Sequence, residues 1–271
     1  MTAQLLIYES VVPLSARRHG NGAVEGASGY GFTSKTNSVP LMAVEFPFAA
    51  AEYPIVFAGT KESFVPAVIL GVRESQNLYL SRDAKWEAKY IPAFVRRYPF
   101  VFTKSEDGQR LVLCIDESYS GFNREGRGER LFSEDGKPTP YVENVLKFLQ
   151  EYQAQFAITE AFCAKLRELD LLEVMQAQVE MRSGEKLSLT GFLAVSRAKL
   201  KALAGDKLAE LARADELELL YLHLQSMRNF TALPDRLAVI EQDKADGGRE
   251  AVPAAGANEK GAKAKTSRAR G

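Results

Sequence analysis

The sequence predicts an α+β protein with a β-rich N-terminal portion (residues 1–135), a mainly helical C-terminal portion (residues 136–240) that contains one β-hairpin, and a disordered tail (residues 241–271). Three observations support this fold class. Short β-prone runs separated by Gly, Pro, Asn and Asp fill the first portion, as in strand-rich domains. From Pro138 the apolar residues recur at helical spacing. The tail has no Phe, Tyr, Trp, Leu or Ile with which to build a core.

The β-rich portion contains extended apolar runs that are expected to form short strands. They are "YPIVFAG", "FVPAVILGV", "NLYLS", "FVFTK" and "RLVLCID". The clearest hairpin is "FVFTKSEDGQRLVLCID", in which two β-prone runs flank an Asp107-Gly108 turn. Its second strand is expected to bring Asp116 and Glu117 to one end of the hairpin.

Helices are predicted from Thr139 onward. Thr139 is an N-cap candidate, and Pro140 suits the first helical position because its fixed φ angle matches a helix. Thr159 is expected to cap a second helix. The apolar residues of the first helix recur at helical spacing and are Tyr141, Val145, Phe148, Leu149, Tyr152 and Phe156.

A second hairpin is predicted among the helices, in "EVMQAQVEMRSGEKLSLTGFLAV", where apolar and polar residues alternate up to Ser183-Gly184. Two further helices follow it. Asp206 is expected to cap the first of them. Asp215, with Glu218 three residues later, is expected to form a capping box for "ELELLYLHLQSMRN". The alternating apolar residues of the hairpin are Met175, Ala177, Val179 and Met181.

The composition limits the classes of partner. The chain has 271 residues, of which 46% are hydrophobic, so it can bury a core as one large domain or two small ones. Lys+Arg and Asp+Glu both total 35, which gives no general reason to expect nucleic acid or an anionic membrane. The longest apolar stretch is interrupted by Glu45 and Glu52, so no membrane span is expected. Two cysteines and the absence of a secretory leader favour a cytoplasmic location.

The predicted tail carries a local excess of positive charge. Its last residues contain five cations against Glu259 alone, namely Lys260, Lys263, Lys265, Arg268 and Arg270. Such a segment can contact RNA, DNA or a membrane surface weakly, but a solubilising tail is the simpler interpretation. We therefore expect no specific nucleic-acid partner.

Two adjacent arginines, Arg96 and Arg97, lie among aromatic residues in "YIPAFVRRYPFVF". If this segment is a strand, Arg96 stacks among rings; if Pro92 opens a short helix, both arginines lie in its last turn. We favour the short helix, followed by a strand from Pro99. Adjacent side chains point in different directions in either structure, so one arginine is expected to be structural. The other is then free for a carboxylate, with Asp116 and Glu117 as internal competitors, or for a ligand.

The two histidines, His19 and His223, are the remaining candidates for chemistry. No Cys or His spacing indicates zinc, and an iron-type triad with Glu45 has no spacing signal. His223 and Ser226 lie three residues apart, like a base and a nucleophile, but no G-x-S-x-G motif supports that role. No glycine-rich loop has nucleotide-binding spacing. The candidate binding residues are therefore Arg96, Arg97, His223 and Ser226, and no metal or cofactor is predicted.

An ordered set of short motifs resembles the SapC family of bacterial proteins. The motifs are "VPLSARRH", "NSVPLMAVEFPFAAAEYPIVF", "NLYLSRDAKWEAKYIPAFVRRYPFVF", "RLFSEDGKPT" and "LLYLHLQSMRNFTAL", and together they extend over roughly residues 5–233. The resemblance implies a role connected with surface-layer biogenesis or serum resistance. It brings no catalytic residues that could be carried over to this chain.

Two functions are consistent with the sequence. The first is a SapC-like accessory or binding protein that acts through a protein or peptide partner without catalysis. The second is an enzyme, metal-dependent in one version, that acts on an anionic or aromatic small ligand near Arg96 and His223. The two differ in one structural expectation, since a metal enzyme requires His19, His223 and a carboxylate to meet.

Overall fold

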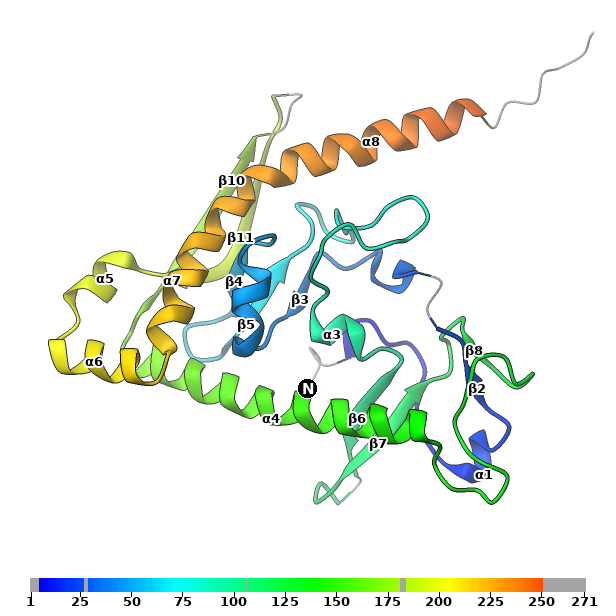
Figure 1. Ribbon diagram of the computed structural model, residues 1–271. Helices are drawn as coiled ribbons and strands as arrows, with labels where there is room; N and C mark the ends of the chain where they lie inside the picture. Colours follow the sequence, from blue (N-terminus) through cyan, green and yellow to red (C-terminus); the bar gives the residue numbers. More distant parts are fainter. Residues whose placement is uncertain (1–4, 27–28, 106, 181–183, 251–271) are drawn as a thin grey trace, which may run out of the picture.

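The computed structural model describes residues 5–26, 29–105, 107–180 and 184–250, with side chains described up to residue 242. Its sheets and helices are mixed along the chain, which confirms the predicted α+β class (Figure 1). The predicted hairpins, the helix after Thr139 and the short helix at the paired arginines are all present.

The largest sheet contains strands from both portions of the sequence. Its five antiparallel strands lie in the order β10 (Leu172–Glu180), β11 (Lys186–Val195), β4 (Ile55–Gly59), β5 (Phe64–Ile69) and β3 (Ser38–Pro40). The hairpin β10-β11 joins the N-terminal strands where Leu193 of β11 pairs with Phe57 of β4. Met181, predicted as part of this hairpin, lies outside the described residues. The β-rich and helical portions of the sequence therefore share one sheet.

Two smaller sheets form the other end of the molecule. One has the order β1 (Val11–Pro13), β7 (Leu111–Asp116) and β6 (Phe100–Lys104), and it contains the predicted hairpin with Gly108 at a positive φ of 70° in its turn. The other has the order β8 (Phe122–Asn123), β2 (Ala23–Val24) and β9 (Glu129–Arg130). Asp116 ends β7, as predicted.

The run "NLYLS" was predicted as a strand, and this prediction is wrong. Only an isolated bridge forms there, between Leu80 and Trp86. The Asn77 side chain donates to the Thr33 hydroxyl (3.0 Å) and accepts from the Tyr79 backbone N–H (2.9 Å). These side-chain bonds take the place of a sheet ladder.

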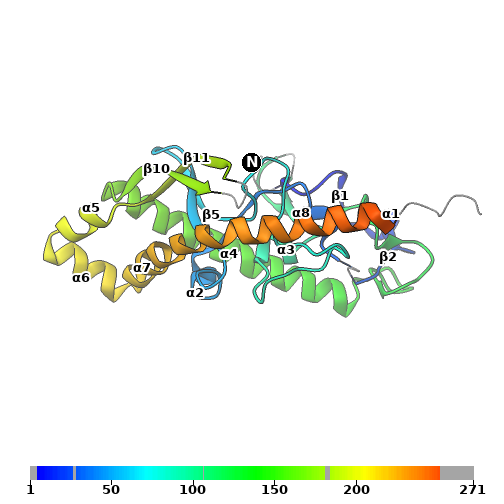
Figure 2. The same ribbon diagram turned by 90° about the horizontal axis from the view of Figure 1, so that it is seen from above.

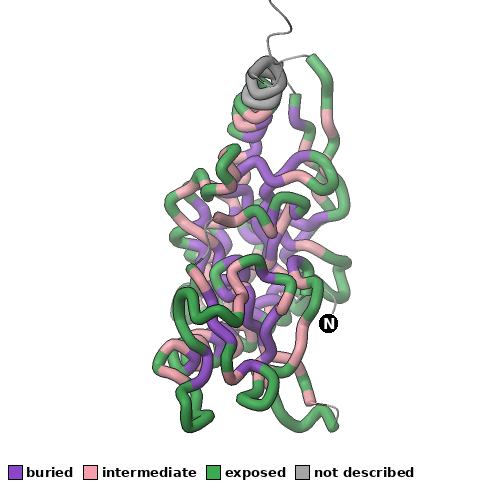
Figure 3. The backbone as a smooth tube through the Cα atoms, turned by 90° about the vertical axis from the view of Figure 1, so that its right-hand side faces the viewer, coloured by how far each residue is buried: buried purple, intermediate pink, exposed green. Residues whose placement is uncertain are grey.

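Helix α4 (Pro140–Glu168) connects the two ends of the molecule (Figure 1). Val142 and Leu149 pack in the core of the smaller sheets, and Phe162 and Leu166 pack in the core of the large sheet. In Figure 3 the buried residues run through the middle of the molecule, with exposed loops outside. A single 29-residue helix thus spans both cores.

The helix break predicted at Thr159 is wrong, because Thr159 is buried inside α4. Its hydroxyl donates to the Gln155 carbonyl one turn earlier (2.7 Å) and accepts from the Ala43 backbone N–H (2.9 Å). The hydroxyl is therefore satisfied without a helix start.

The remaining helices are mostly short. The α-helices are α1 (Ala16–His19), α2 (Phe46–Ala49), α3 (Ala93–Arg96), α5 (Arg197–Ala202), α6 (Gly205–Arg213), α7 (Glu216–Ser226) and α8 (Leu233–Glu250). The 3-10 helices are η2 (Gly31–Thr33), η3 (Ala43–Glu45) and η4 (Met227–Ala232). No helix among the described residues combines the length and apolar character that are needed to cross a membrane.

The two capping predictions in this region need correction. Asp206 lies in the first turn of α6, and Ala204 occupies the N-cap position. Asp215 does precede α7, but its backbone is left-handed with a φ of 58°, and its side chain makes no capping hydrogen bond. A capping side chain normally accepts from an extended backbone, whereas here the tight turn from α6 into α7 requires the left-handed conformation that Asp tolerates.

Helix α8 continues past the predicted start of the tail at residue 241. Figure 1 shows it on the side of the molecule opposite α4, and in Figure 2, seen from above, it runs in front of α3 and α4. Leu237 is buried in the large core, and Glu241 forms an ion pair with Arg73 at 3.0 Å. Residues 241–246 are Glu, Gln, Asp, Lys, Ala and Asp, and no proline follows Pro234 before Pro253, so nothing in this stretch stops the helix at 240. The rest of the predicted tail, residues 251–271, lies outside the described residues.

Removing residues 251–271 should leave the melting temperature of the protein unchanged within about 1 °C. The segment has no apolar residue larger than valine, so it has little apolar surface to bury. Thermal unfolding followed by circular dichroism measures this directly. A fall of several degrees would show that the tail contributes to the folded state.

Candidate functional site

The paired arginines lie at the end of α3, which begins after Pro92 and is followed by strand β6. The predicted short helix followed by a strand is confirmed. Arg96 is the last residue of α3 and Arg97 is its C-cap, so the two side chains leave the helix in different directions. Their surroundings differ accordingly.

Arg97 is buried, with 3% of its surface exposed. Its guanidinium carbon lies 4.3 Å from the ring centre of Phe94, 4.9 Å from that of Tyr152 and 5.5 Å from that of Tyr8. A planar cation enclosed by rings on three sides is held by cation–π attraction and by packing. Arg97 is therefore the structural arginine of the pair.

Arg96 lies on the surface. Its Nε donates to the Ile91 carbonyl (3.0 Å), and its guanidinium carbon lies 5.9 Å from the ring centre of Tyr90 and 5.4 Å from that of Phe148. Phe48, 61% exposed, stacks on Tyr90 with ring centres 5.4 Å apart. We refer to Phe48, Tyr90, Arg96 and Phe148 as the arginine face.

A buried carboxylate, that of Glu45, fixes the position of the arginine face through hydrogen bonds. Glu45 accepts hydrogen bonds from the Met42 N–H (2.8 Å), the Ala93 N–H (2.7 Å) and the Tyr90 hydroxyl (2.7 Å). Burial raises the pKa of Glu45 above its ordinary value, although these hydrogen bonds oppose the shift. The start of α3 and the Tyr90 ring are thereby fixed to the segment that precedes α2.

Replacing Arg97 with lysine should lower the free energy of unfolding by roughly 1 to 3 kcal/mol, because an ammonium cannot stack on three rings as a guanidinium does. The matched change Arg96→Lys should stay within about 0.5 kcal/mol of the wild type, since Arg96 lies on the surface. Urea denaturation of both variants measures the difference. Equal losses would contradict the division of roles between the two arginines.

His223 and Ser226 connect α7 to the large sheet. The buried His223 Nε2 accepts from the Val195 N–H (3.0 Å). The buried Ser226 hydroxyl accepts from the Ile55 N–H (3.0 Å) and donates to the His223 carbonyl (2.7 Å). Burial lowers the pKa of His223 to about 4, so the ring is neutral at physiological pH. Their predicted part in binding remains a prediction; in this conformation both side chains hydrogen-bond to backbone groups and have no exposed surface.

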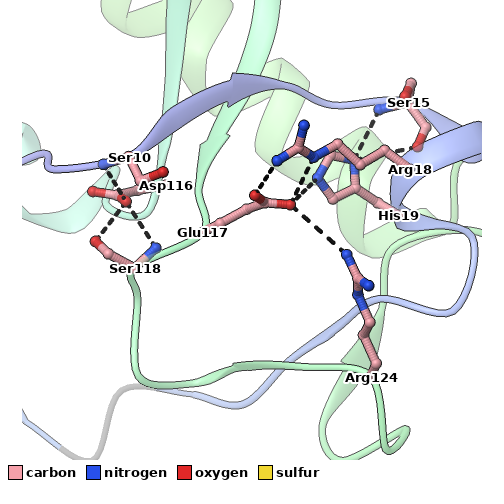
Figure 4. A network of polar contacts seen from close by, with 8 residues as sticks. All are labelled: Ser10, Ser15, Arg18, His19, Asp116, Glu117, Ser118 and Arg124. Atoms are coloured by element: carbon pink, nitrogen blue, oxygen red, sulfur yellow. Dashed lines mark hydrogen bonds and ion pairs between the residues drawn. The ribbon is translucent and has the colours of Figure 1, made fainter.

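His19 belongs to a different cluster, at the end of β7 (Figure 4). Its Nε2 lies 3.2 Å from Glu117 Oε1, and its Nδ1 lies 3.2 Å from the Ser15 carbonyl oxygen. Glu117 also accepts from Arg18 Nε (2.9 Å) and lies 4.0 Å from Arg124. The hydrogen bond from Arg18 is the main cause that lowers the pKa of Glu117. Glu117 is thus engaged by a cluster that does not include the paired arginines.

Asp116, next to Glu117, braces the N-terminal segment. Its carboxylate accepts from the backbone N–H groups of Glu9 (2.7 Å), Ser10 (2.9 Å) and Ser118 (3.0 Å) and from the Ser118 hydroxyl (2.6 Å). Burial alone would raise its pKa, but these hydrogen bonds hold it below the ordinary value. These hydrogen bonds and ion pairs of Asp116 and Glu117 involve neither Arg96 nor Arg97. They therefore give no support to the predicted competition of the two carboxylates for an arginine of α3.

The structure does not bring the two histidines together. His19 contacts Glu117 beside β7, and His223 contacts β11 from α7. Within the described ranges, no group of three His, Cys, Asp or Glu side chains is placed to hold a metal ion. The expectation attached to a metal enzyme, that His19, His223 and a carboxylate converge, is therefore not met among these residues.

Sequence reasoning did not identify Phe48, Glu45 and Phe148 as neighbours of Arg96. These residues come from α2, η3 and α4, respectively, so no local pattern connects them to α3. One signal was available, since "EFPF" and "YIPAF" both place aromatic residues around a proline that can start a helix.

In a comparison with known protein families, the model of the SapC family matches residues 14–233 of the chain. No curated protein and no solved structure matches the chain. The matched range includes α3, the cluster of His19 and Glu117, and α7, so it covers most of the chain and every site described above. This chain belongs to the SapC family.

Proposed function

We propose that this protein is a non-catalytic accessory protein of the bacterial cytoplasm that binds a protein or peptide partner on the arginine face. The family assignment is compatible with an accessory role. A link to surface-layer or cell-surface biogenesis is part of the proposal and is supported only by the name of the family. The binding part is supported by the geometry around Arg96.

The observation that carries the proposal is the exposed pairing of aromatic rings with a cation. Phe48 is 61% exposed, and Val44 on the neighbouring η3 is 52% exposed. Arg, Tyr and other aromatic residues are enriched among the few residues that dominate interface energies. Arg96 interacts with the Tyr90 hydroxyl and, through its charge, with the buried Glu45, but its side chain lies on the surface, where it can also contact a partner.

The arginine face also defines the chemistry of the partner. The rings of Phe48 and Phe148 offer apolar surface, and the guanidinium between them offers a planar fork of donors that matches a carboxylate. Because Glu45 fixes Tyr90 and the start of α3, little ordering of the face is required on binding. We therefore expect a partner segment in which an acidic residue lies next to apolar residues.

The proposal is tested by crosslinking. A photoreactive phenylalanine analogue replaces Phe48 in the full chain, which is expressed in the cells from which the sequence comes, and crosslinked partners are identified by mass spectrometry. We expect one protein to be captured, and Arg96→Ala should reduce its yield about tenfold, since losing a charged bidentate contact costs about 1.4 kcal/mol or more.

A matched control separates the arginine face from surface exposure in general. Val174 lies on β10 and is 71% exposed, so the same analogue at position 174 should not capture that protein. Capture from both positions, or a yield that is unaffected by Arg96→Ala, would overturn the proposal.

A further inference from the structure

An open cavity of about 380 Å³ lies beside the end of β7, apart from the arginine face. Its walls come from five separate segments of the chain. The residues on which the argument depends are Glu9, Phe32, Asp83, Tyr98, Ser118 and Tyr119. The volume falls within the range of small-ligand sites in proteins.

The charge of the cavity is negative. Glu9 and Asp83 line it, and no Lys or Arg is present among its described lining residues. Both residues are exposed, and neither carboxylate forms an ion pair within the part of the chain that the structure describes. Burial is the main cause that raises the pKa of Tyr98 to about 12, and the nearby charges of Asp116 and Glu9 contribute in the same direction. The carboxylates of Glu9 and Asp83 therefore create a negative electrostatic potential in the cavity, which favours a cation.

One wall of the cavity is aromatic. Phe32 and Tyr98 stack with ring centres 4.1 Å apart and an interplanar angle of 22°, and Tyr119 meets Tyr98 edge-on at 5.4 Å. Aromatic faces attract cations, and planar cations can also stack on them. A carboxylate rim next to stacked rings is thus suited to an organic cation rather than to a compact metal ion.

The cavity is braced by bonds between its walls. Asp116 accepts from the N–H groups of Glu9 and Ser10 and from Ser118, which joins two of the walls; Figure 4 shows the bonds from Ser10 and Ser118. The Tyr30 N–H donates to the Ala84 carbonyl (2.6 Å), which joins two further walls. A Cβ at Gly29 would lie 2.8 Å from that carbonyl oxygen, so glycine is required for this close approach. The site is therefore formed before a ligand arrives.

We propose that this cavity binds a guanidinium group, carried either by an arginine side chain of a polypeptide or by a free guanidino compound. Because Phe32 and Tyr98 cover each other's inner faces and Tyr8 and Tyr119 both contact Tyr98, the planar cation stacks on the outer face of Phe32 while its N–H groups donate to Glu9 and Asp83. An ammonium group offers the same charge without the planar fork. This site is separate from the arginine face, where the protein supplies the cation, so the two proposals stand or fall independently.

Calorimetric titration of the full-length protein tests this proposal with defined probes. N-acetyl-arginine methylamide represents a polypeptide side chain, and agmatine represents a free guanidino compound. N-acetyl-citrulline methylamide is the neutral control, with nearly the same shape as the first probe. We expect at least one guanidinium probe to bind and the citrulline probe to bind about tenfold more weakly or not at all. The tighter of the two guanidinium probes identifies the source.

Three variants locate the binding site. Glu9→Gln and Asp83→Asn remove the charges of exposed side chains without changing their shape, and each should weaken binding about tenfold. Glu134→Gln, an exposed carboxylate outside the cavity, should leave binding unchanged. Absence of binding by both guanidinium probes at millimolar concentration would overturn the proposal. Equal binding of the citrulline probe, or unchanged binding to the Glu9 and Asp83 variants, would also overturn it.

Discussion

Replacing Asp116 with alanine should lower the free energy of unfolding by roughly 3 to 4 kcal/mol at neutral pH. The substitution leaves the backbone N–H groups of Glu9, Ser10 and Ser118 without their acceptor. Hydrogen bonds to a charged group contribute roughly 1.5 to 3 kcal/mol each, and because the three donor residues have exposed surface, water recovers part of the summed loss. Urea denaturation compares the variant with the wild type.

The control for Asp116 is Ser118→Ala, which removes one hydroxyl donor and should cost only about 1 kcal/mol. A loss below about 1 kcal/mol for Asp116→Ala would show that water replaces the carboxylate, contrary to the prediction. The hydrogen bonds that lower the pKa of Asp116 also set a pH dependence. Because the folded pKa is depressed, this contribution is complete above the unfolded value of about 3.9 and is lost as pH falls through the folded value.

As the pH falls, protonation of His223 should destabilise the protein at a higher pH than protonation of Asp116 does. The unfolded chain protonates this histidine near about pH 6.5, whereas burial lowers the folded pKa to about 4. The contribution of neutral His223 to the free energy of unfolding is therefore fully present above about pH 6.5. It falls by about 3 kcal/mol in total as the pH drops to the folded pKa. Denaturation curves between neutral pH and about pH 4 measure this slope.

His223→Gln separates this effect from other titrations. The glutamine oxygen can accept from the Val195 N–H in place of Nε2, so the variant should fold with a flatter pH profile across this window. His19→Gln is the matched control, since burial also lowers the pKa of His19, although the nearby Glu117 opposes that shift. A wild-type protein equally stable at both ends of the window would contradict the role of His223.

The parts of the fold that local patterns determine were predicted from the sequence. The change from strand runs to helical spacing, both hairpins and the short helix at the arginines follow from neighbouring residues. Errors arose where a polar side chain has two uses. Thr159 and Asp215 both suit a helix start. The Thr159 hydroxyl instead donates to a carbonyl one turn earlier in α4, and Asp215 occupies a left-handed position in the turn before α7.

Contacts between distant segments were beyond prediction. Pairing of Phe57 with Leu193 unites the two halves of the sequence in one sheet, but nothing near either residue encodes the register. For the arginines, the prediction that at most one is fully committed to the aromatic cluster followed from local geometry alone. Which one does so depends on where α3 lies relative to Tyr8 and α4, and Arg97 faces them. The acidic cavity combines five segments and has no local signature.

The sharing of one sheet by both halves affects how the protein is made. Strand β4 emerges from the ribosome early, but its neighbour β11 follows only after α4 and β10 have been synthesised. At about 5 to 20 residues per second this delay is on the order of ten seconds. During that time one edge of β4 has no partner strand, and an unpaired strand edge is a template for association between nascent chains. The large sheet and the core that packs on it therefore cannot be completed until β11 has been synthesised, late in translation, whereas the core of the smaller sheets needs nothing beyond the first turns of α4.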